Sequence, residues 1–151
     1  MTNEALKEKI IELLPAATFD EAGQWLTINV KPNDWKLLAE QLRKDATLLF
    51  DFLFCLTCID WKTHLTMVYH LTSTRYRHSL VIKSKLDRNN PEIETVSDIW
   101  RTAEFHEREV YDLFGVKFLH HPDLRRLLLT DDFDGYPLRK DFEDPINMIK
   151  L

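Results

Sequence analysis

The stretch "DFLFCLTCIDWKTHLTMVYHLTSTRYRHSLVIKSKL", residues 51–86, decides the fold class of this 151-residue chain. It holds three runs rich in aliphatic and aromatic residues, and the second and third runs alternate apolar with polar side chains, as half-buried strands do. The short gaps at residues 61–64 and 73–78 fit hairpin turns. Three consecutive strands with short connections predict an antiparallel meander that is covered by helices.

Two helices and one more strand are expected before this stretch. Residues 4–14 place apolar side chains at helical spacing and are followed by a proline, so they predict an amphipathic helix. Residues 25–30, "WLTINV", alternate as a strand. Residues 31–44 predict a second amphipathic helix, with Asn33 as the expected N-cap. The sequence therefore predicts an α+β fold, with a small antiparallel or mixed sheet of about four strands packed by helices.

A third helix and an arm are expected after the meander. The segment 98–114 predicts a charged helix that ends at Gly115. Regular periodicity disappears after Phe118, and the remaining sequence contains three prolines and several aspartates. We therefore assign residues 1–118 to the α+β domain and residues 119–151 to an extended C-terminal arm. A stretch of this length without regular structure usually serves a partner, so the arm is expected to bind another chain.

Composition excludes several classes of protein. The net charge of −5 provides no general attraction to nucleic acid, so no nucleic-acid partner is expected. The longest apolar runs are far shorter than the roughly 18 residues that span a bilayer, so no membrane span is expected. The first residues resemble neither a secretion signal nor a transit peptide.

Two cysteines form a C-x-x-C motif at Cys55 and Cys58. This motif can indicate a redox pair or half of a metal site. The aromatic run around it favours a buried strand instead, in which the odd spacing sends the two thiols to opposite faces. We therefore interpret them as structural cysteines rather than a redox pair.

The third helix places a carboxylate where an apolar residue is expected. Glu107 lies in line with an apolar stripe that should face the core, and no face of this helix is plainly polar. The pairs Glu104–Arg108 and Arg108–Asp112 are four residues apart and can neutralise one another. Buried carboxylates that remain need cationic partners, either from a second chain or from the four basic residues downstream. These are Arg125, Arg126, Arg139 and Lys140.

The residues alone also allow three other functions: a soluble enzyme, a metal site and an adaptor. Glu107, Glu109 and Asp112 offer carboxylates for acid–base catalysis in a soluble enzyme, although the sequence has neither a glycine-rich phosphate loop nor a nucleophile elbow. The pair His120–His121 offers metal ligands but lacks the H-E-x-x-H spacing. A free-standing adaptor that binds a partner without a membrane is a third alternative.

The charged helix and the arm resemble a known family. The residues E-R-E at 107–109, followed by Asp112, Leu113-Phe114, His121, Arg125 and Leu127-Leu128, are similar to the signature of the 30 kDa (C-type) subunit family of respiratory complex I. The likeness runs over residues 97–142 and includes "GYPLRKDF" at 135–142, with a weaker echo in "LTCIDW" at 56–61.

This resemblance implies a function. It implies a non-catalytic structural subunit of a proton-translocating NADH:quinone oxidoreductase, in the peripheral arm on the cytoplasmic side of a bacterial plasma membrane. FMN, iron–sulfur clusters and quinone are then expected in partner subunits, and none of them in this chain. The expected partners are the 49 kDa (D-type) chain and the iron–sulfur subunits of the quinone module. The equivalent subunit of a ferredoxin-linked quinone reductase or of a membrane-bound hydrogenase stays an alternative.

The resemblance also implies the role of particular residues. No catalytic, cofactor-binding or metal-ligating residue is expected. The chain has almost no leader and stops nine residues after Phe142, so we expect a separate bacterial-type polypeptide rather than a mitochondrial one. The residues expected at the subunit interface are Glu107, Arg108, Glu109, Asp112, His121, Pro122, Arg125, Arg126, Arg139, Lys140 and Asp141.

Overall fold

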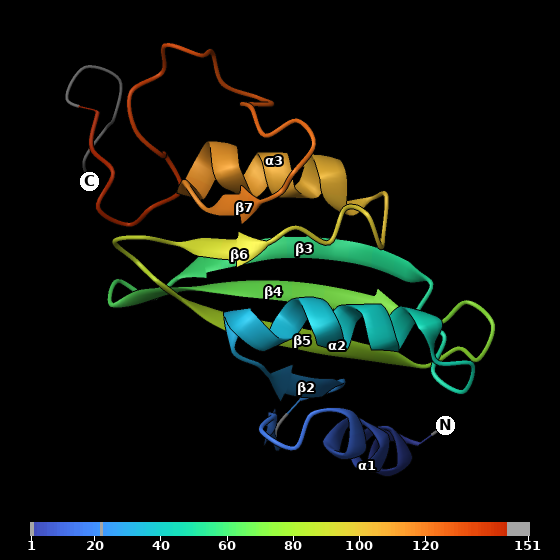
Figure 1. Ribbon diagram of the computed structural model, residues 1–151. Coiled ribbons are helices and arrows are strands. Elements are labelled where there is room, and N and C mark those ends of the chain that lie inside the picture. The colour runs from blue at the N-terminus through green and yellow to red at the C-terminus, as the bar shows by residue number, and fades with distance from the viewer. Residues whose placement is uncertain (1, 22, 145–151) are drawn as a thin grey trace.

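A five-stranded mixed sheet and three helices make up the fold in a computed structural model, which describes residues 2–21 and 23–144 (Figure 1). The end of the expected arm, residues 145–151, lies outside the described residues. The α+β fold class is confirmed. Across the sheet the strands are β1 Thr18–Asp20, β2 Leu26–Asn29, β5 Ser79–Asp87, β4 His64–Thr72 and β3 Phe52–Asp60.

The predicted meander forms one side of this sheet, with β5 at the centre and β3 at the edge. β3 pairs with β4 and β4 with β5, both antiparallel, and the register sets Tyr69 opposite Ile82 on the core side. The two turns contain Lys62 and Arg77 at positive φ, 70° and 55°. Because alternate side chains of each strand point to the same face, one face of the sheet is continuously apolar.

β2 runs parallel to β5, so the sheet is mixed, which is one of the two predicted arrangements. The edge strand β1 adds a fifth strand to the four that were expected. β1 is only three residues long and just Phe19 is half-buried, so it leaves no period-2 signal in the sequence. A separate two-stranded parallel sheet joins β6, Glu92–Glu94, to β7, Lys117–Leu119.

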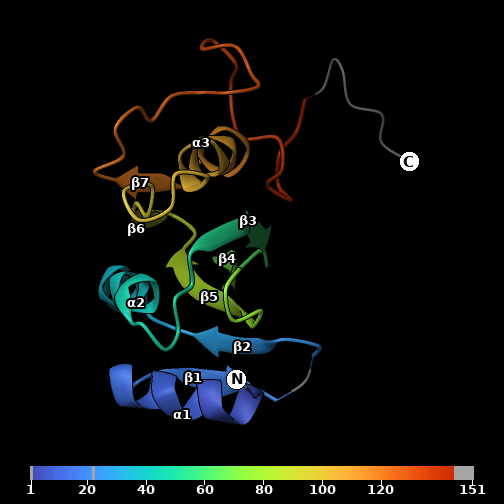
Figure 2. The same ribbon diagram turned by 90° about the vertical axis from the view of Figure 1, so that its right-hand side faces the viewer.

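The helices lie on one side of the large sheet. α1, Asn3–Leu13, and α2, Pro32–Lys44, bury their apolar stripes against it, with Trp35 and Ile10 fully enclosed. α3, Ala103–Phe114, contacts β3 at the edge of the sheet. Figure 2 shows α2 on one side of the strands and no helix on the other.

Two predicted helix starts are wrong. α2 begins at Pro32 with Lys31 as its N-cap, so Asn33 lies inside the helix; proline is favoured at the first helical position because it lacks an amide hydrogen. The charged helix begins at Ala103 rather than at residue 98. Tertiary hydrogen bonds hold the residues before it in turns: Trp100 Nε1 donates to the Phe50 carbonyl at 2.8 Å and Thr102 Oγ1 to the Leu53 carbonyl at 2.7 Å.

Both cysteines are free thiols in β3. Cys58 is buried with the core face, whereas Cys55 is half-buried on the alternate side, as its spacing predicts. Burial, followed by the charge of Asp60, raises the pKa of Cys58 to about 12, so its thiol stays protonated and unreactive. The structural interpretation of this pair is thus supported.

Gly115 ends α3 in the left-handed conformation, as predicted, with φ of 79°. A Cβ at this position would lie 2.7 Å from the ring of Tyr136, which belongs to the arm. We predict that Gly115→Ala lowers the free energy of unfolding by about 1–3 kcal/mol, because it combines an unfavourable φ with this overlap. Denaturant unfolding measures the change.

Gly23→Ala is the matched control, since Gly23 also has a positive φ but its Cβ would meet no atom closer than 3.8 Å. An equal loss in both variants would show that the Tyr136 contact contributes nothing.

Candidate functional site

Asp112 in α3 holds the first turn of the arm. Its side chain is fully buried, and one carboxylate oxygen accepts the amides of Leu128 at 2.7 Å, Leu129 at 3.0 Å and Leu127 at 3.3 Å. The other oxygen accepts from Arg126 Nη1 at 3.1 Å. Burial alone would raise the pKa of Asp112, but these hydrogen bonds to its charged form hold the pKa below its ordinary value. The carboxylate therefore fixes three successive backbone amides.

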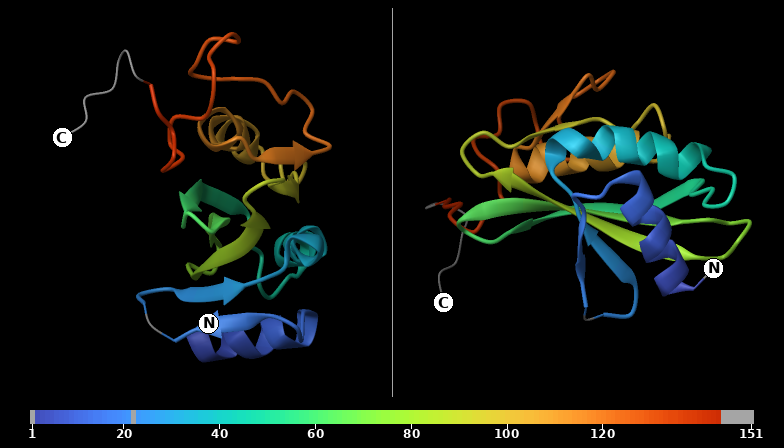
Figure 3. Two further views of the ribbon diagram at one scale, coloured as in Figure 1. Left: turned by 90° about the vertical axis from the view of Figure 1, so that its left-hand side faces the viewer. Right: turned by 60° about the horizontal axis from the view of Figure 1, so that its bottom comes forward.

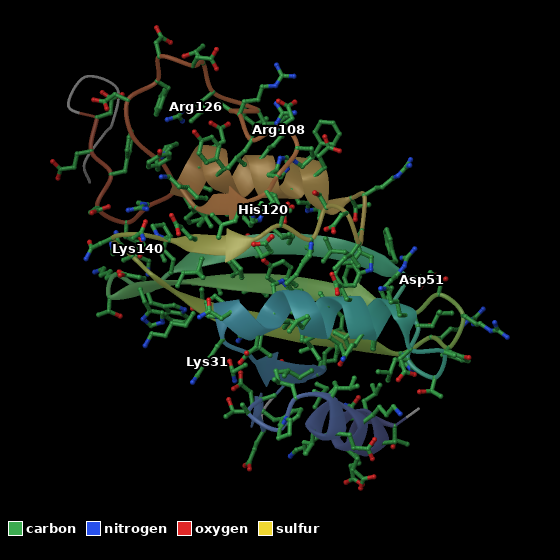
Figure 4. The ribbon with its side chains drawn as sticks, in the orientation of Figure 1. Lys31, Asp51, Arg108, His120, Arg126 and Lys140 are labelled. Atoms are coloured by element: carbon green, nitrogen blue, oxygen red, sulfur yellow. The ribbon has the colours of Figure 1, made fainter. Side chains whose placement is uncertain are left out.

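The arm then wraps around the guanidinium of Arg126. Arg126 Nη2 donates to the carbonyls of Phe133 and Gly135, each at 3.1 Å. Its guanidinium also lies over the rings of Phe133 and Tyr136, 5.7 and 5.2 Å from the centroids. One side chain thus joins α3 to ten residues of irregular chain, and Figure 4 shows Arg126 and Arg108 between α3 and the arm.

Arg108 also binds arm backbone. Its Nε donates to the Arg125 carbonyl at 3.1 Å and its Nη2 to the Arg126 carbonyl at 3.0 Å. The predicted pairs of Arg108 with Glu104 and with Asp112 are therefore wrong. Carbonyl groups of the arm need donors where they lie against α3, and the guanidinium supplies two in fixed geometry.

A second anchor lies at Asp60, at the end of β3. Its buried carboxylate accepts from the Arg88 guanidinium and from the amides of Lys62 at 2.7 Å and Lys140 at 2.8 Å. Burial acts to raise the pKa of Asp60, but the Arg88 bond and the two amides lower it to about 2. Arg88 also pairs with Asp141 at 3.0 Å, so this anchor holds the later part of the arm.

The four predicted cations divide between these contacts. Arg126 binds a carboxylate of α3, as predicted. Arg139 instead donates to the Phe114 carbonyl at 2.7 Å, Arg125 pairs with Asp123 at 3.0 Å, and Lys140 contributes its backbone amide. Of the four basic residues that the sequence offers as partners, Arg126 is therefore the one that pairs with a carboxylate of α3 within the described residues.

Glu107 lies on the core side of α3, as its place in the apolar stripe predicts. It is fully buried, accepts from the Thr95 hydroxyl and from the Val96 amide at 3.0 Å, and lies 3.8 Å from His121 Nε2. Burial raises the pKa of Glu107 to about 7, because these two hydrogen bonds only partly replace the lost water. The group thus titrates near neutrality inside the protein.

The two histidines diverge. His121 Nε2 donates to the Glu104 carbonyl at 3.0 Å while its Nδ1 accepts the Asp123 amide at 3.0 Å, which fits a neutral ring that closes the turn after β7. His120 points to solvent and bonds Glu94 at 2.5 Å. Within residues 2–21 and 23–144, no group of three His, Cys, Asp or Glu side chains is arranged to hold a metal ion.

Apolar side chains remain exposed around this framework. Phe105 is 56% exposed and Leu128 64% exposed, and Leu127 and the carboxylate of Glu109 also face solvent. We refer to these four residues as the α3–arm surface. The buried charges lie beneath it and the apolar groups on it, so this surface is suited to contact with another protein rather than to acid–base chemistry.

The predicted interface residues differ in their burial. The side chains of Glu107, Asp112 and His121 are fully buried, those of Arg108 and Arg126 are nearly so, and Arg139 is half-buried. The exposed ones are Glu109, Pro122, Arg125, Lys140 and Asp141. Whether any of them contacts another chain stays a prediction. Sequence reasoning missed Asp60 and Arg88, and the only available signal was a carboxylate that ends a strongly apolar strand.

Comparison with known proteins identifies the family. A profile of the family described as "Respiratory-chain NADH dehydrogenase, 30 Kd subunit" matches residues 28–146. The chain belongs to this 30 kDa subunit family. Its relatives include the C subunit of NADH-quinone oxidoreductase from Roseiflexus sp. (strain RS-1), 35% identical over 147 residues, with 93% of this chain and 84% of that protein covered.

Some relatives are much longer. The C/D subunit of NADH-quinone oxidoreductase from Phocaeicola vulgatus is 47% identical over 118 residues, which cover 77% of this chain and 23% of that protein. The C subunit from Chloroherpeton thalassium is 42% identical over 111 residues, 72% of this chain and 46% of that protein. The matched region therefore spans less than half the length of these two family members.

Solved structures agree on the fold. The structure described as "Nqo5 of the trypsin-resistant fragment (1-134) in P63 form" has a TM-score of 0.68 and 25% identity, covering 82% of this chain and all of that one. A chain of the archaeal membrane-bound sulfane sulfur reductase has a TM-score of 0.70 and 28% identity, covering 93% and 85%. In the described part of this family member, no helix is long and apolar enough to cross a membrane.

Asp112→Asn tests the first anchor. The asparagine side chain keeps one acceptor oxygen but loses the charge that three amides and Arg126 share. We predict a loss of about 2–4 kcal/mol in the free energy of unfolding at pH 7, with faster amide exchange at residues 127–129.

The low pKa of Asp112 gives this effect a defined pH dependence. A carboxyl group whose folded pKa is depressed stabilises the protein above its unfolded value of 3.8 and loses this contribution as pH falls through the folded pKa. The difference between wild type and Asp112→Asn should therefore shrink in acid. Asp131→Asn, an exposed change in the same arm, is the control and should leave stability and exchange unaltered.

Glu107→Gln tests the buried carboxyl group. Glutamine resembles the protonated acid, so it should be no less stable than wild type at low pH. The raised pKa means that unfolded Glu107 ionises above about 4.5 while the folded group keeps its proton, so wild type loses stability as pH rises from 4.5 to about 7. We predict that the free energy of unfolding of Glu107→Gln at pH 8 exceeds that of wild type by up to roughly 3 kcal/mol.

The control is Glu109→Gln, which removes the same charge from an exposed position of α3. Thermal unfolding between pH 4 and pH 8 gives the comparison. A difference in stability between Glu107→Gln and wild type that stays constant over this range would contradict a raised pKa of Glu107.

Proposed function

We propose that this chain is a non-catalytic structural subunit in the peripheral arm of a proton-translocating NADH:quinone oxidoreductase, where it docks on a 49 kDa (D-type) chain. The observation that carries this proposal is the α3–arm surface: exposed apolar side chains lie over a framework of internally satisfied charges in a member of the 30 kDa family. The C/D names of several relatives support a D-type partner.

The state of the carboxylates supports a structural role. Asp112 and Asp60 direct their oxygen atoms to backbone amides and guanidinium groups of their own chain, and Glu107 faces Thr95 and Val96. A general acid or base has to reach a substrate proton, and these groups face the protein interior. Their bonds instead fix the shape of the surface that a partner meets.

The redox groups belong to partner subunits in this proposal. FMN, iron–sulfur clusters and quinone are held by other chains, including the iron–sulfur subunits of the quinone module. An iron–sulfur cluster generally requires four ligands, and this sequence has two cysteines, of which Cys58 is buried as a protonated thiol. The chain itself is peripheral to a bacterial plasma membrane, on the cytoplasmic side.

A second candidate function follows from the likeness to the archaeal sulfane sulfur reductase complex. On that alternative, this chain is the equivalent subunit of a membrane complex with another electron donor, such as ferredoxin, or of a hydrogenase. Docking through the α3–arm surface is common to both alternatives. The identity of the co-purifying subunits and the oxidation of NADH distinguish them.

Leu128→Glu tests the docking surface. Leu128 is 64% exposed, so a charge at this position should not disturb the isolated chain, but it would be desolvated in an interface. We predict that the tagged variant, expressed in its host, recovers at least about tenfold less D-type chain from gently solubilised membranes than wild type does.

The matched control is Leu37→Glu, because Leu37 is 67% exposed but lies on α2, away from the α3–arm surface. It should retain the D-type chain. Normal recovery with Leu128→Glu, at unchanged thermal stability, would show that this surface is not the docking site.

A further inference from the structure

The face of the sheet opposite α1 and α2 carries no helix (Figure 3). The side chains at its two ends differ in their chemistry. At one end Trp25, Phe54 and His70 pack edge to face, with ring centroids 5.2–5.9 Å apart. At the other end lie the lysines Lys31, Lys83 and Lys85. The signature of the charged helix and the arm, residues 107–128, does not line the groove in which these lysines lie.

A groove of about 400 Å³ crosses the basic end of this face. Its floor takes residues from all five strands, from Thr18 in β1 to Ile59 in β3. Trp61, which follows β3 and is 53% exposed, lines the groove at the β3 edge. The groove thus runs across the strands, and the apolar ring of Trp61 lies at its β3 end.

Three lysines give the groove a positive character. Lys83 pairs with Asp20 at 3.7 Å, but Lys31 and Lys85 have no carboxylate partner within residues 2–21 and 23–144. In a chain with a net charge of −5, this concentration of lysines, two of them unpaired, favours an anionic ligand.

The dimensions of the groove select the kind of anion. Neighbouring strands lie about 4.8 Å apart, so five strands give a channel of roughly 19 Å. An extended peptide rises about 3.3 Å per residue and spans this length with about six residues. A compact anion such as phosphate would fill only part of this long groove. It would also offer no apolar group to pack against Trp61.

We propose that this groove binds an extended acidic segment of a partner polypeptide, with carboxylates facing Lys31, Lys83 and Lys85 and an apolar side chain against Trp61. The binding is a property of the β-sheet face and does not depend on which membrane complex contains the chain. It is also separate from the α3–arm surface, so one chain can hold two partner segments at once.

Fluorescence anisotropy of a labelled hexapeptide tests the proposal. The probe contains three glutamates and one phenylalanine, and its comparison peptide has glutamine in place of every glutamate. We expect the acidic peptide to bind the full chain at least about tenfold more tightly than the glutamine peptide, with an affinity that falls as salt is added. The double variant Lys31→Gln/Lys85→Gln should lose at least about tenfold in affinity, and Trp61→Ala should also weaken binding.

The control variant is Lys44→Gln/Lys117→Gln, which removes two exposed lysines away from the groove and should keep wild-type affinity. Equal binding of both peptides, or unchanged binding by Lys31→Gln/Lys85→Gln, overturns the proposal.

Two further outcomes would reassign the groove. Displacement of the peptide by sodium tripolyphosphate, but not by chloride at equal ionic strength, together with binding of tripolyphosphate tighter than that of the peptide, would indicate a phosphate ligand and overturn the proposal. Self-association of the full chain that is lost in Lys31→Gln/Lys85→Gln, seen by analytical ultracentrifugation, would assign the face to a second copy and overturn it as well. Normal recovery of the D-type chain by these variants leaves the proposed function intact in either case.

Discussion

Two carboxylates withdrawn from water determine the path of the arm between residues 126 and 141. A buried carboxylate costs several kcal/mol unless hydrogen bonds and positive charge replace its hydration. Asp112 meets this requirement with three successive amides and Arg126, and Asp60 meets it with two amides and Arg88. Most of these donors come from the arm, which has no helix or strand between residues 120 and 144. The path of the arm is therefore set by hydrogen bonds to Asp112 and Asp60 rather than by the regular backbone hydrogen bonds of a helix or sheet.

The surface of the molecule reflects the same constraint. The amides of residues 127–129 point inward to Asp112, and in this turn Leu127 and Leu128 are exposed while Leu129 is half-buried. Leu128 is one of the most exposed apolar groups in the described part of the chain. Arg108 and Arg126 are held beneath them by carbonyl groups. Charged side chains usually lie at the surface and leucines in the interior. In this part of the molecule the placement is reversed, because the arm is anchored through buried charges.

Local periodicity predicted the parts of the fold that depend on local spacing. The meander, the end of α3 at Gly115 and the burial of Glu107 all follow from repeats of two or 3.6 residues. The start of α3, in contrast, depends on hydrogen bonds from Trp100 and Thr102 to residues about fifty positions away, which leave no local pattern. Pairing of Arg108 within its own helix was predicted from spacing and is wrong, because carbonyl groups of the arm compete for the same guanidinium. Arg126 was one of four basic residues expected as possible partners of the helix carboxylates, but residue spacing alone could not show that Arg126 is the one that pairs with Asp112.

The anchor between Asp60 and Lys140 joins residues 80 positions apart, which has a consequence for synthesis on the ribosome. Chains emerge from their N-terminus, so the sheet and α3 are available before the arm that satisfies their carboxylates. Until residues 126–129 emerge, Asp112 lacks its donors and stays in contact with water, which keeps this side of the nascent protein open. The leucines of the turn consequently reach their final positions only after the sheet and α3 have been synthesised. Formation of the α3–arm surface therefore follows formation of the sheet in time.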